Sequence, residues 1–255
     1  MYKKKKNLFR DVFGNFYFIK RFLIFILGLL SYNRYNGFNK LLLKGTEYIK
    51  NLPDKKVLFI SNHQTYFADV FAMFHVFCSI KNGFINTIHN PIYLLNPKVN
   101  LYYVADEETM NKNFLSKLFI YLGGITVKRI WKKNKKINYS LNMSEISRMG
   151  KALDDGWLIT FPQGTTKAFA PGRRGIVHVI RKYNPIVVPI VIEGFYDTYD
   201  KKGFNIKKKG GLQKMTFKEP IKIDLKKETT NNIMEKIMDS IEQSKKFKIK
   251  NVKSF

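Results

Sequence analysis

The sequence predicts an α/β fold, with a mixed, mainly parallel sheet flanked by helices. Short apolar runs alternate with segments of helical periodicity, as in parallel strands joined by helical crossovers. The length of 255 residues suits one large domain with short additions at its ends. Hydrophobic residues make up 45% of the chain, which is enough for a buried core and excludes a disordered protein.

The amino-terminal segment is basic and then apolar. Residues 1–21 contain seven basic residues and one acid, and nine apolar residues follow at 22–30. A spanning helix needs about 20 apolar residues, and a longer helix would bury Lys20 and Arg21. No small-residue cleavage site follows, so a secretory signal also fits poorly. We therefore expect residues 1–45 to form membrane-interface helices with lysines on anionic headgroups; the alternative is a helix packed on the protein's own core.

The main domain is expected at residues 46–225, followed by an amphipathic helix and a basic tail at 226–255. The segments predicted as strands are 57–60, 101–104, 125–130, 157–161, 186–192, 215–217 and 221–223. The segments predicted as helices are 66–80, 144–155, 174–183 and 231–244. Gly156 suits a helix C-cap, and Pro189 suggests an edge strand or a bulge. The basic segments 201–211 and 245–255 are expected to be loop or tail.

The net charge of +27 must attract anions, which include nucleic acids, anionic bilayers and phosphorylated substrates. The basic residues are scattered over tails and loops, and no nucleic-acid motif is present, so no nucleic-acid partner is expected. A single cysteine, Cys78, excludes an internal disulfide and is predicted to be a buried, inert thiol. No Cys/His cluster has metal-ligand spacing, so no metal site is expected.

Two loops carry the candidate chemistry, and each directly follows a predicted core strand. The first contains His63, with Asp69 early in the next helix. A carboxylate on one imidazole nitrogen would fix the tautomer and leave the other nitrogen free to accept a proton from a hydroxyl. A lone loop histidine is more often a polar surface residue, but the following aspartate and the preceding core strand favour a functional role. His75 and His178 are read as packing residues.

The second loop supplies backbone and cationic groups. Gly164 permits close approach, and Thr165 can donate a hydrogen bond. Arg173 and Arg174 precede a predicted helix, which suits a phosphate site, although a turn with solvated arginines is the alternative. Arg129, at the end of a strand, is a further candidate ligand. If the two strands are parallel, both loops open at the same carboxyl edge of the sheet, where α/β sheets bind ligands.

Four segments together resemble the glycerolipid acyltransferase family, which includes 1-acylglycerol-3-phosphate acyltransferases. Residues 62–69 match its Asn-His-x4-Asp block, and residues 124–129 match a block that ends in arginine. Residues 161–166 match its Phe-Pro-Glu-Gly-Thr-Arg block, and residues 188–190 match its Val-Pro-aliphatic block. Each block alone is weak, but four blocks in the family's order over about residues 50–195 are specific.

The resemblance implies acyl transfer on a mixed αβ sheet, with amino-terminal helices resting on a membrane. His63 would deprotonate the hydroxyl of a lysophospholipid, which attacks the thioester of acyl-CoA or acyl carrier protein, and Asp69 would orient His63. The resemblance implies no metal, no cofactor and no covalent enzyme intermediate. The second and third blocks would hold the acceptor's phosphate through Arg129 and the Gly164–Thr165 backbone, helped by Lys167.

Three departures from the family pattern concern the dyad or the acceptor. Five residues, rather than four, separate His63 from Asp69. One extra residue rotates a helical side chain by about 100°, so a bulge or longer turn must absorb it. Gln163 replaces the family glutamate, and Thr166 replaces its arginine. Arg173 or Arg174 is expected to supply the missing charge.

The expected function is that of a 1-acylglycerol-3-phosphate O-acyltransferase, which forms phosphatidic acid from lysophosphatidic acid in phospholipid biosynthesis. The enzyme is expected at the cytoplasmic face of a membrane, as a peripheral or monotopic protein. One alternative is another lysophospholipid or an aminolipid as acceptor. Two further alternatives are a non-catalytic basic protein that binds membranes or nucleic acid, and a degenerate acyltransferase kept as a membrane scaffold.

Overall fold

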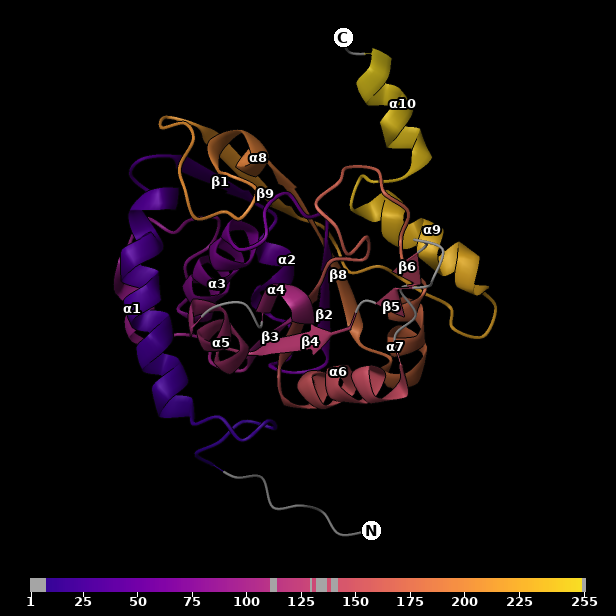
Figure 1. Cartoon of the computed structure of the whole chain (residues 1–255), viewed down its shortest axis with the longest axis horizontal. Helices are drawn as coiled ribbons and strands as arrows, with labels where there is room; N and C mark the ends of the chain where they lie inside the picture. The colour runs from indigo at the N-terminus through magenta and orange to yellow at the C-terminus, as the bar shows by residue number, and fades with distance from the viewer. Residues whose placement is uncertain (1–7, 111–113, 129, 132–136, 139–141, 254–255) are drawn as a thin grey trace.

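The computed structural model describes residues 8–110, 114–128, 130–131, 137–138 and 142–253. A seven-stranded sheet with strand order β1-β9-β8-β2-β7-β3-β4 lies at its centre (Figure 1). Its neighbouring strands are parallel except β8 and β9, which are antiparallel. The predicted fold class, a mixed and mainly parallel sheet flanked by helices, is confirmed.

The strands of the large sheet are β1 (Lys40–Lys44), β2 (Val57–Ser61), β3 (Leu101–Asp106), β4 (Gly124–Val127), β7 (Trp157–Thr160), β8 (Ile186–Glu193) and β9 (Leu212–Phe217). A small antiparallel sheet pairs β5 (Ile130–Trp131) with β6 (Ile137–Asn138). The helices of the amino-terminal half are α1 (Tyr17–Tyr35), α2 (Glu47–Lys50), α3 (Ala68–Lys81), the 3-10 helix η1 (Pro91–Leu95), α4 (Glu107–Met110) and α5 (Phe114–Tyr121). Those of the carboxyl-terminal half are α6 (Met143–Asp155), α7 (Gly175–Tyr183), α8 (Phe195–Thr198), α9 (Thr230–Ser240) and α10 (Lys245–Lys253).

Helices cover both faces of the sheet, and β2 shows how its side chains divide between them. Val57 and Phe59 join a core with α1 and α3, whereas Leu58 and Ile60 join a second core with α6, α7 and α9. Alternate residues of a strand point to opposite faces, so all of β2 is buried. This explains why β2 is a continuous apolar run rather than an alternating one.

Helix α6 illustrates how local sequence sets an element's ends. Its first turn is fixed by a capping box, in which the Asn142 side chain accepts from the Glu145 N–H and Glu145 accepts from the Asn142 N–H. Ile146, Met149 and Leu153 are buried as their helical spacing predicts. The helix ends at Gly156, as predicted.

Helix α1 divides its faces between the protein and solvent. Ile24 and Gly28 are buried against the core, so the predicted alternative of packing on the protein is confirmed for this face. Lys20 is buried and pairs with Asp11 at 3.0 Å, so the expectation that it contacts lipid headgroups is wrong. Phe18 and other apolar residues of the opposite face are exposed. Among the described residues, no helix is long and apolar enough to cross a membrane.

Four expectations about elements are wrong. The segment 1–45, expected to be helical, contains strand β1, which pairs with β9. Pro189 lies in β8 between β2 and β9, so the edge-strand alternative is wrong; its missing N–H is accommodated where the pairing with β9 ends, at Ile190 opposite Phe217. Residues 221–223 are not a strand, although the Ile221 N–H donates to the Val187 carbonyl at 2.8 Å. The expected tail contains helix α10.

Candidate active site

The candidate site begins where two neighbouring strands end. Strands β2 and β7 are parallel, with Ile60 opposite Thr160. The loops after these strands therefore leave the sheet side by side, as the sequence predicts. They place His63 and Phe161 against each other, with ring centroids 3.8 Å apart and 19° between the ring planes.

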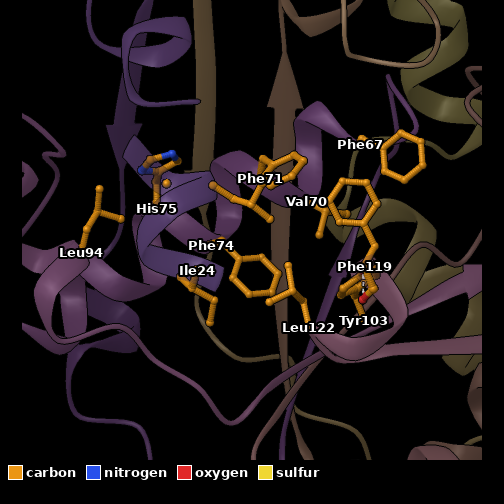
Figure 2. A pocket seen from close by; sticks show the side chains of 12 residues that line it. Ile24, Phe67, Val70, Phe71, Phe74, His75, Leu94, Tyr103, Phe119 and Leu122 are labelled. Atoms are coloured by element: carbon orange, nitrogen blue, oxygen red, sulfur yellow. Dashed lines mark hydrogen bonds between the residues drawn. The ribbon is translucent and has the colours of Figure 1, made fainter. Parts of the chain in front are cut away.

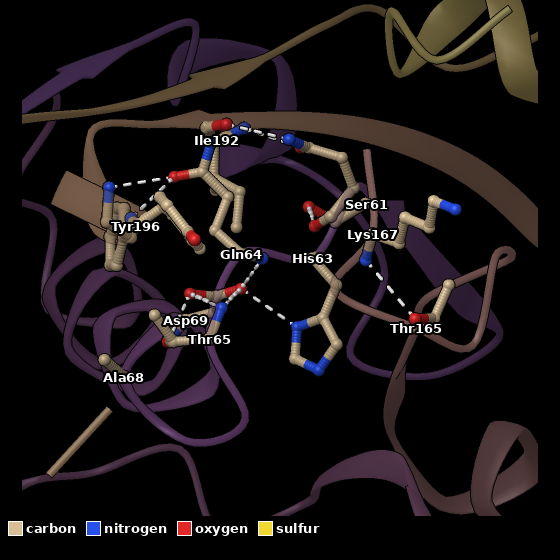
Figure 3. Close-up of polar contacts among 12 residues, drawn as sticks. Ser61, His63, Gln64, Thr65, Ala68, Asp69, Thr165, Lys167, Ile192 and Tyr196 are labelled. Carbon is tan, nitrogen blue, oxygen red and sulfur yellow. Dashed lines mark hydrogen bonds and ion pairs between the residues drawn. The ribbon is translucent and has the colours of Figure 1, made fainter. Parts of the chain in front are cut away.

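His63 and Asp69 form the predicted pair. The Nδ1 atom of His63 lies 2.9 Å from Oδ2 of Asp69, and the carboxylate is fully buried (Figure 3). Because an ionised carboxylate only accepts hydrogen bonds, Nδ1 carries the proton and Nε2 is the unprotonated nitrogen. Figure 3 shows that this second nitrogen points away from Asp69. The pair thus has the geometry of a general base with an orienting carboxylate.

The turn before α3 absorbs the extra residue between His63 and Asp69. The helix begins at Ala68 rather than at the predicted residue 66, so Asp69 lies in its first turn. Its carboxylate also accepts from the Gln64 N–H at 2.6 Å and from the Thr65 hydroxyl at 2.7 Å. These hydrogen bonds fold the turn around the Asp69 carboxylate and hold that carboxylate beside His63.

Two polar side chains of the same loop fix its position, and sequence reasoning assigned them no role. Asn62 donates to the Ile192 carbonyl and accepts from the Ile192 N–H, both at 2.8 Å. Gln64 accepts from the Phe195 N–H at 2.8 Å. Both partners lie far along the chain, at the end of β8 and in α8, so no local pattern could have identified them.

A cavity opens beside His63 and contains several polar groups that could hold a substrate. Its lining includes Lys128, Arg173, Gly164 and Thr165. The lining also includes one carboxylate-bearing residue, Asp106, at the end of β3. The cations are suited to an anionic group next to the base.

Gly164 makes room for Arg173. Its backbone is in the left-handed region, with φ of +58°, and a Cβ atom there would lie 2.1 Å from Cζ of Arg173. The Arg173 guanidinium donates to the Gly164 carbonyl at 2.6 Å. The Gly164 N–H donates to the Phe161 carbonyl at 2.8 Å, so Gly164 is a spacer rather than the expected N–H donor to a phosphate. Within the described part of the chain, the Thr165 N–H has no partner, which leaves it available to a ligand.

The remaining predicted ligands lie elsewhere. Gln163 is buried, and its side chain donates to the Ala170 carbonyl at 3.0 Å, so it holds the loop together instead of lining the cavity. Lys167 and Arg174 are exposed and do not line the cavity. Arg129 lies outside the described residues.

The comparisons with known proteins agree with this geometry. The family model described as Acyltransferase matches residues 40–193, which is more than half of the chain. The chain belongs to the acyltransferase family. A similar solved structure is that of PlsC, the 1-acyl-sn-glycerophosphate (LPA) acyltransferase from Thermotoga maritima, with a TM-score of 0.54 and 16% identity over 92% of this chain and 80% of that chain. At this identity the likeness shows a shared fold. No curated protein matches the sequence.

This acyltransferase has a second, apolar pocket between α1 and α3. Figure 2 shows Ile24, Phe74 and Leu122 pointing toward one another within it. Val70 and Tyr103 line both this pocket and the His63 cavity, so the two spaces adjoin.

The other predicted residues of the acyltransferase have structural roles or none. Cys78 is buried, and burial raises the pKa of its thiol to about 11, so the inert thiol is confirmed. His75 is buried, as expected of a packing residue. His178 is exposed on α7, so its prediction as a packing residue is wrong. No cluster of three or more potential metal ligands occurs among the described residues.

Proposed function

We propose that this acyltransferase is a 1-acylglycerol-3-phosphate O-acyltransferase, which transfers a fatty acyl group from a thioester donor to lysophosphatidic acid. The observation that carries this proposal is the position of the His63–Asp69 pair in a cavity that also contains Arg173. A base and a cationic group next to each other suit an acceptor that has both a hydroxyl and a phosphate. The likeness to the fold of the named PlsC enzyme supports the same reaction.

In the proposed reaction, Nε2 of His63 accepts the proton of the acceptor hydroxyl as its oxygen attacks the thioester carbonyl. The new C–O bond gives a tetrahedral intermediate, which collapses with cleavage of the C–S bond. The imidazolium then returns its proton to the leaving thiolate. Asp69 holds the ring orientation and stabilises the imidazolium that forms.

The acceptor's phosphate is proposed to lie between Arg173 and the Thr165 N–H. A guanidinium can bind two phosphate oxygens through parallel hydrogen bonds. Lys128 adds a cation on the β4 side of the cavity. This arrangement would set the hydroxyl of a short glycerol backbone beside His63.

The acyl chain of the donor is proposed to occupy the apolar pocket between α1 and α3. The pocket adjoins the catalytic cavity through Val70 and Tyr103. A thioester at this junction would have its carbonyl near His63 and its chain among apolar side chains. Burial of the chain would stabilise the complex by about 0.8 kcal/mol per methylene group.

The proposal is tested by thioester consumption in anionic vesicles that contain lysophosphatidic acid. We expect His63→Ala to lower turnover by about 10²–10⁴, as for the loss of a general base. His178→Ala is the matched control because its side chain is exposed on α7, away from the cavity lining. Near-normal turnover of a folded His63→Ala variant would refute the mechanism. Transfer to a different lysophospholipid, but not to lysophosphatidic acid, would refute the acceptor.

A further inference from the structure

A basic loop lies against the catalytic loop. Residues 199–211, here called the lysine loop, join α8 to β9. The loop contains five lysines, all exposed: Lys201, Lys202, Lys207, Lys208 and Lys209. Its one acid, Asp200, accepts hydrogen bonds from the N–H groups of Gly203 and Phe204 at 2.7 and 2.9 Å. The exposed surface of the loop is therefore strongly cationic.

Packing holds the lysine loop in a defined conformation. The Phe204 ring stacks on that of Phe67, with centroids 4.6 Å apart. The Arg34 guanidinium donates to the carbonyls of Gly203 and Phe204, both at 2.7 Å. These contacts tie the loop to α1 and to the segment that precedes α3, so its charges have fixed positions relative to both.

The loop is also bonded to a segment that lines the catalytic cavity. The N–H groups of Tyr66 and Phe67 donate to the carbonyls of Lys201 and Lys202, both at 3.0 Å. The Lys201 ammonium lies 5.8 Å from the centre of the Tyr66 ring. Tyr66 and His63 line the same cavity. A partner bound to the lysine loop would therefore stand next to the general base.

The shape and chemistry of this surface fit a protein better than a small molecule. None of the five lysines lines the catalytic cavity or the apolar pocket, whereas small-molecule sites are concave. Exposed aromatic rings lie between the charges: the Lys207 ammonium is 4.7 Å from the Tyr196 ring, and the Lys209 ammonium is 4.9 Å from the Phe38 ring. Aromatic residues are enriched at protein interfaces, and charges around them steer an oppositely charged partner.

We propose that the lysine loop is the docking surface for the acyl donor, and that this donor is an acyl carrier protein with an acidic face. The inference rests on the proposed function, because it names the donor for the same site. Docking there would place the carrier's thioester at the opening of the catalytic cavity. Its acyl chain would then reach the apolar pocket, to which Phe67 of the adjoining segment also belongs.

The test compares two variants with the same change in net charge. One replaces all five lysines of the loop with alanine. The control replaces five exposed lysines on α6, on α7 and in the segment before α9, namely Lys151, Lys182, Lys222, Lys226 and Lys227. Each protein is assayed in vesicles containing lysophosphatidic acid with palmitoyl-carrier protein and, separately, with palmitoyl-CoA. Binding of the carrier and of anionic vesicles is measured directly.

We expect the loop variant to raise KM for the carrier donor about tenfold or more, because electrostatic steering of the carrier is lost. Its kcat should change little. The same variant should keep the wild-type KM for palmitoyl-CoA, and the control variant should keep the wild-type KM for both donors. An unchanged KM for the carrier would overturn the inference, as would an equal rise for both donors. Loss of vesicle binding alone would assign the loop to lipid headgroups instead. Absence of transfer from either donor in the wild type would refute the proposed function. The direct measurement of carrier binding would still show whether the lysine loop is the docking surface.

Discussion

His75 is a buried histidine beside the apolar pocket, and its environment suits only the neutral ring. Its Nε2 atom lies 2.8 Å from the Ser31 hydroxyl, and its Nδ1 atom lies 2.9 Å from the Tyr93 hydroxyl. Ser31 itself donates to the Leu27 carbonyl at 2.7 Å, so it accepts from Nε2. Burial lowers the pKa of His75 to about 3. The ring therefore stays neutral at physiological pH and links α1, α3 and η1.

This depressed pKa makes the stability of the protein sensitive to acid. Between pH 6.5 and 3 the unfolded chain binds a proton at His75 that the folded protein does not. The contribution of neutral His75 to the free energy of unfolding is therefore complete above pH 6.5 and is lost as the pH falls. From pH 7 to pH 5 the loss amounts to about 2 kcal/mol. Urea unfolding at both values should show this extra loss in the wild type and not in His75→Gln. A His178→Gln control should keep the wild-type dependence; an identical dependence in His75→Gln would contradict the assignment.

The residues of the site divide into those that local sequence can identify and those that it cannot. His63 and Asp69 were predicted because both lie in one strand-to-helix turn, and their hydrogen bond is confirmed. The bonds of Asn62 to Ile192 depend on a strand far along the chain. Gln163 was expected at the substrate because its motif borders the cavity, but it lies in a turn closed by the Gly164 N–H and the Phe161 carbonyl, and its side chain donates to the Ala170 carbonyl instead. The catalytic and substrate-binding roles of these residues stay predictions.

At the scale of elements, α1 forms a wall of the apolar pocket at Gly28. A Cβ atom at this position would lie 2.4 Å from Cδ2 of Leu94, which also lines the pocket. We expect Gly28→Leu to fill part of the pocket and to favour donors with shorter acyl chains. The ratio of kcat/KM for long over short donors should fall about tenfold or more, since each methylene in such a pocket is worth about 1–3 kcal/mol.

The measurement is a series of donors of increasing chain length. Ile26→Leu is the control because Ile26 lies on the exposed side of the same helix. Gly28→Ala serves as the smaller step, and thermal unfolding shows whether each variant keeps its fold. An unchanged chain-length profile in a folded Gly28→Leu variant would show that the acyl chain lies elsewhere.

The elements that sequence reasoning misplaced are those defined by distant partners. Strand β1 lies within the segment expected to form membrane-interface helices, yet it pairs with β9 from Lys40 opposite Leu212 onward. The three consecutive leucines at its centre show neither helical spacing nor the alternation of a half-buried strand. Residues 221–223 alternate like a strand, but they form none in the structure, and the Ile221 N–H bonds to the Val187 carbonyl of β8. By contrast, β2 and β7 were predicted correctly because they are buried on both faces and read as continuous apolar runs.

At the scale of the whole molecule, α1 separates the apolar pocket from an exposed apolar surface. Ile24, Leu27 and Gly28 line the pocket, whereas Phe18 and Leu30 are 79% and 75% exposed. At about 100° per residue, the exposed side chains fall on the side of the helix opposite the buried ones. Exposed apolar residues of η1, which packs beside α1, extend this surface: Ile92 and Leu95. An acyl chain in the pocket would thus lie one helix away from this surface.

We expect this surface to hold the enzyme on a membrane, with the basic amino-terminal residues adding attraction to anionic lipids. Removing the whole segment would be a poor test, because Lys20 and Ile24 are buried and their loss would unfold the domain. Phe18→Ser with Leu30→Ser should instead lower binding to anionic vesicles about tenfold or more, since each buried apolar side chain is worth about 1.5–3 kcal/mol, while leaving the fold intact. Met143→Ser with Leu212→Ser is the control, as these side chains are exposed on α6 and β9. Equal vesicle binding by both double variants would show that the membrane contact does not depend on these side chains of α1.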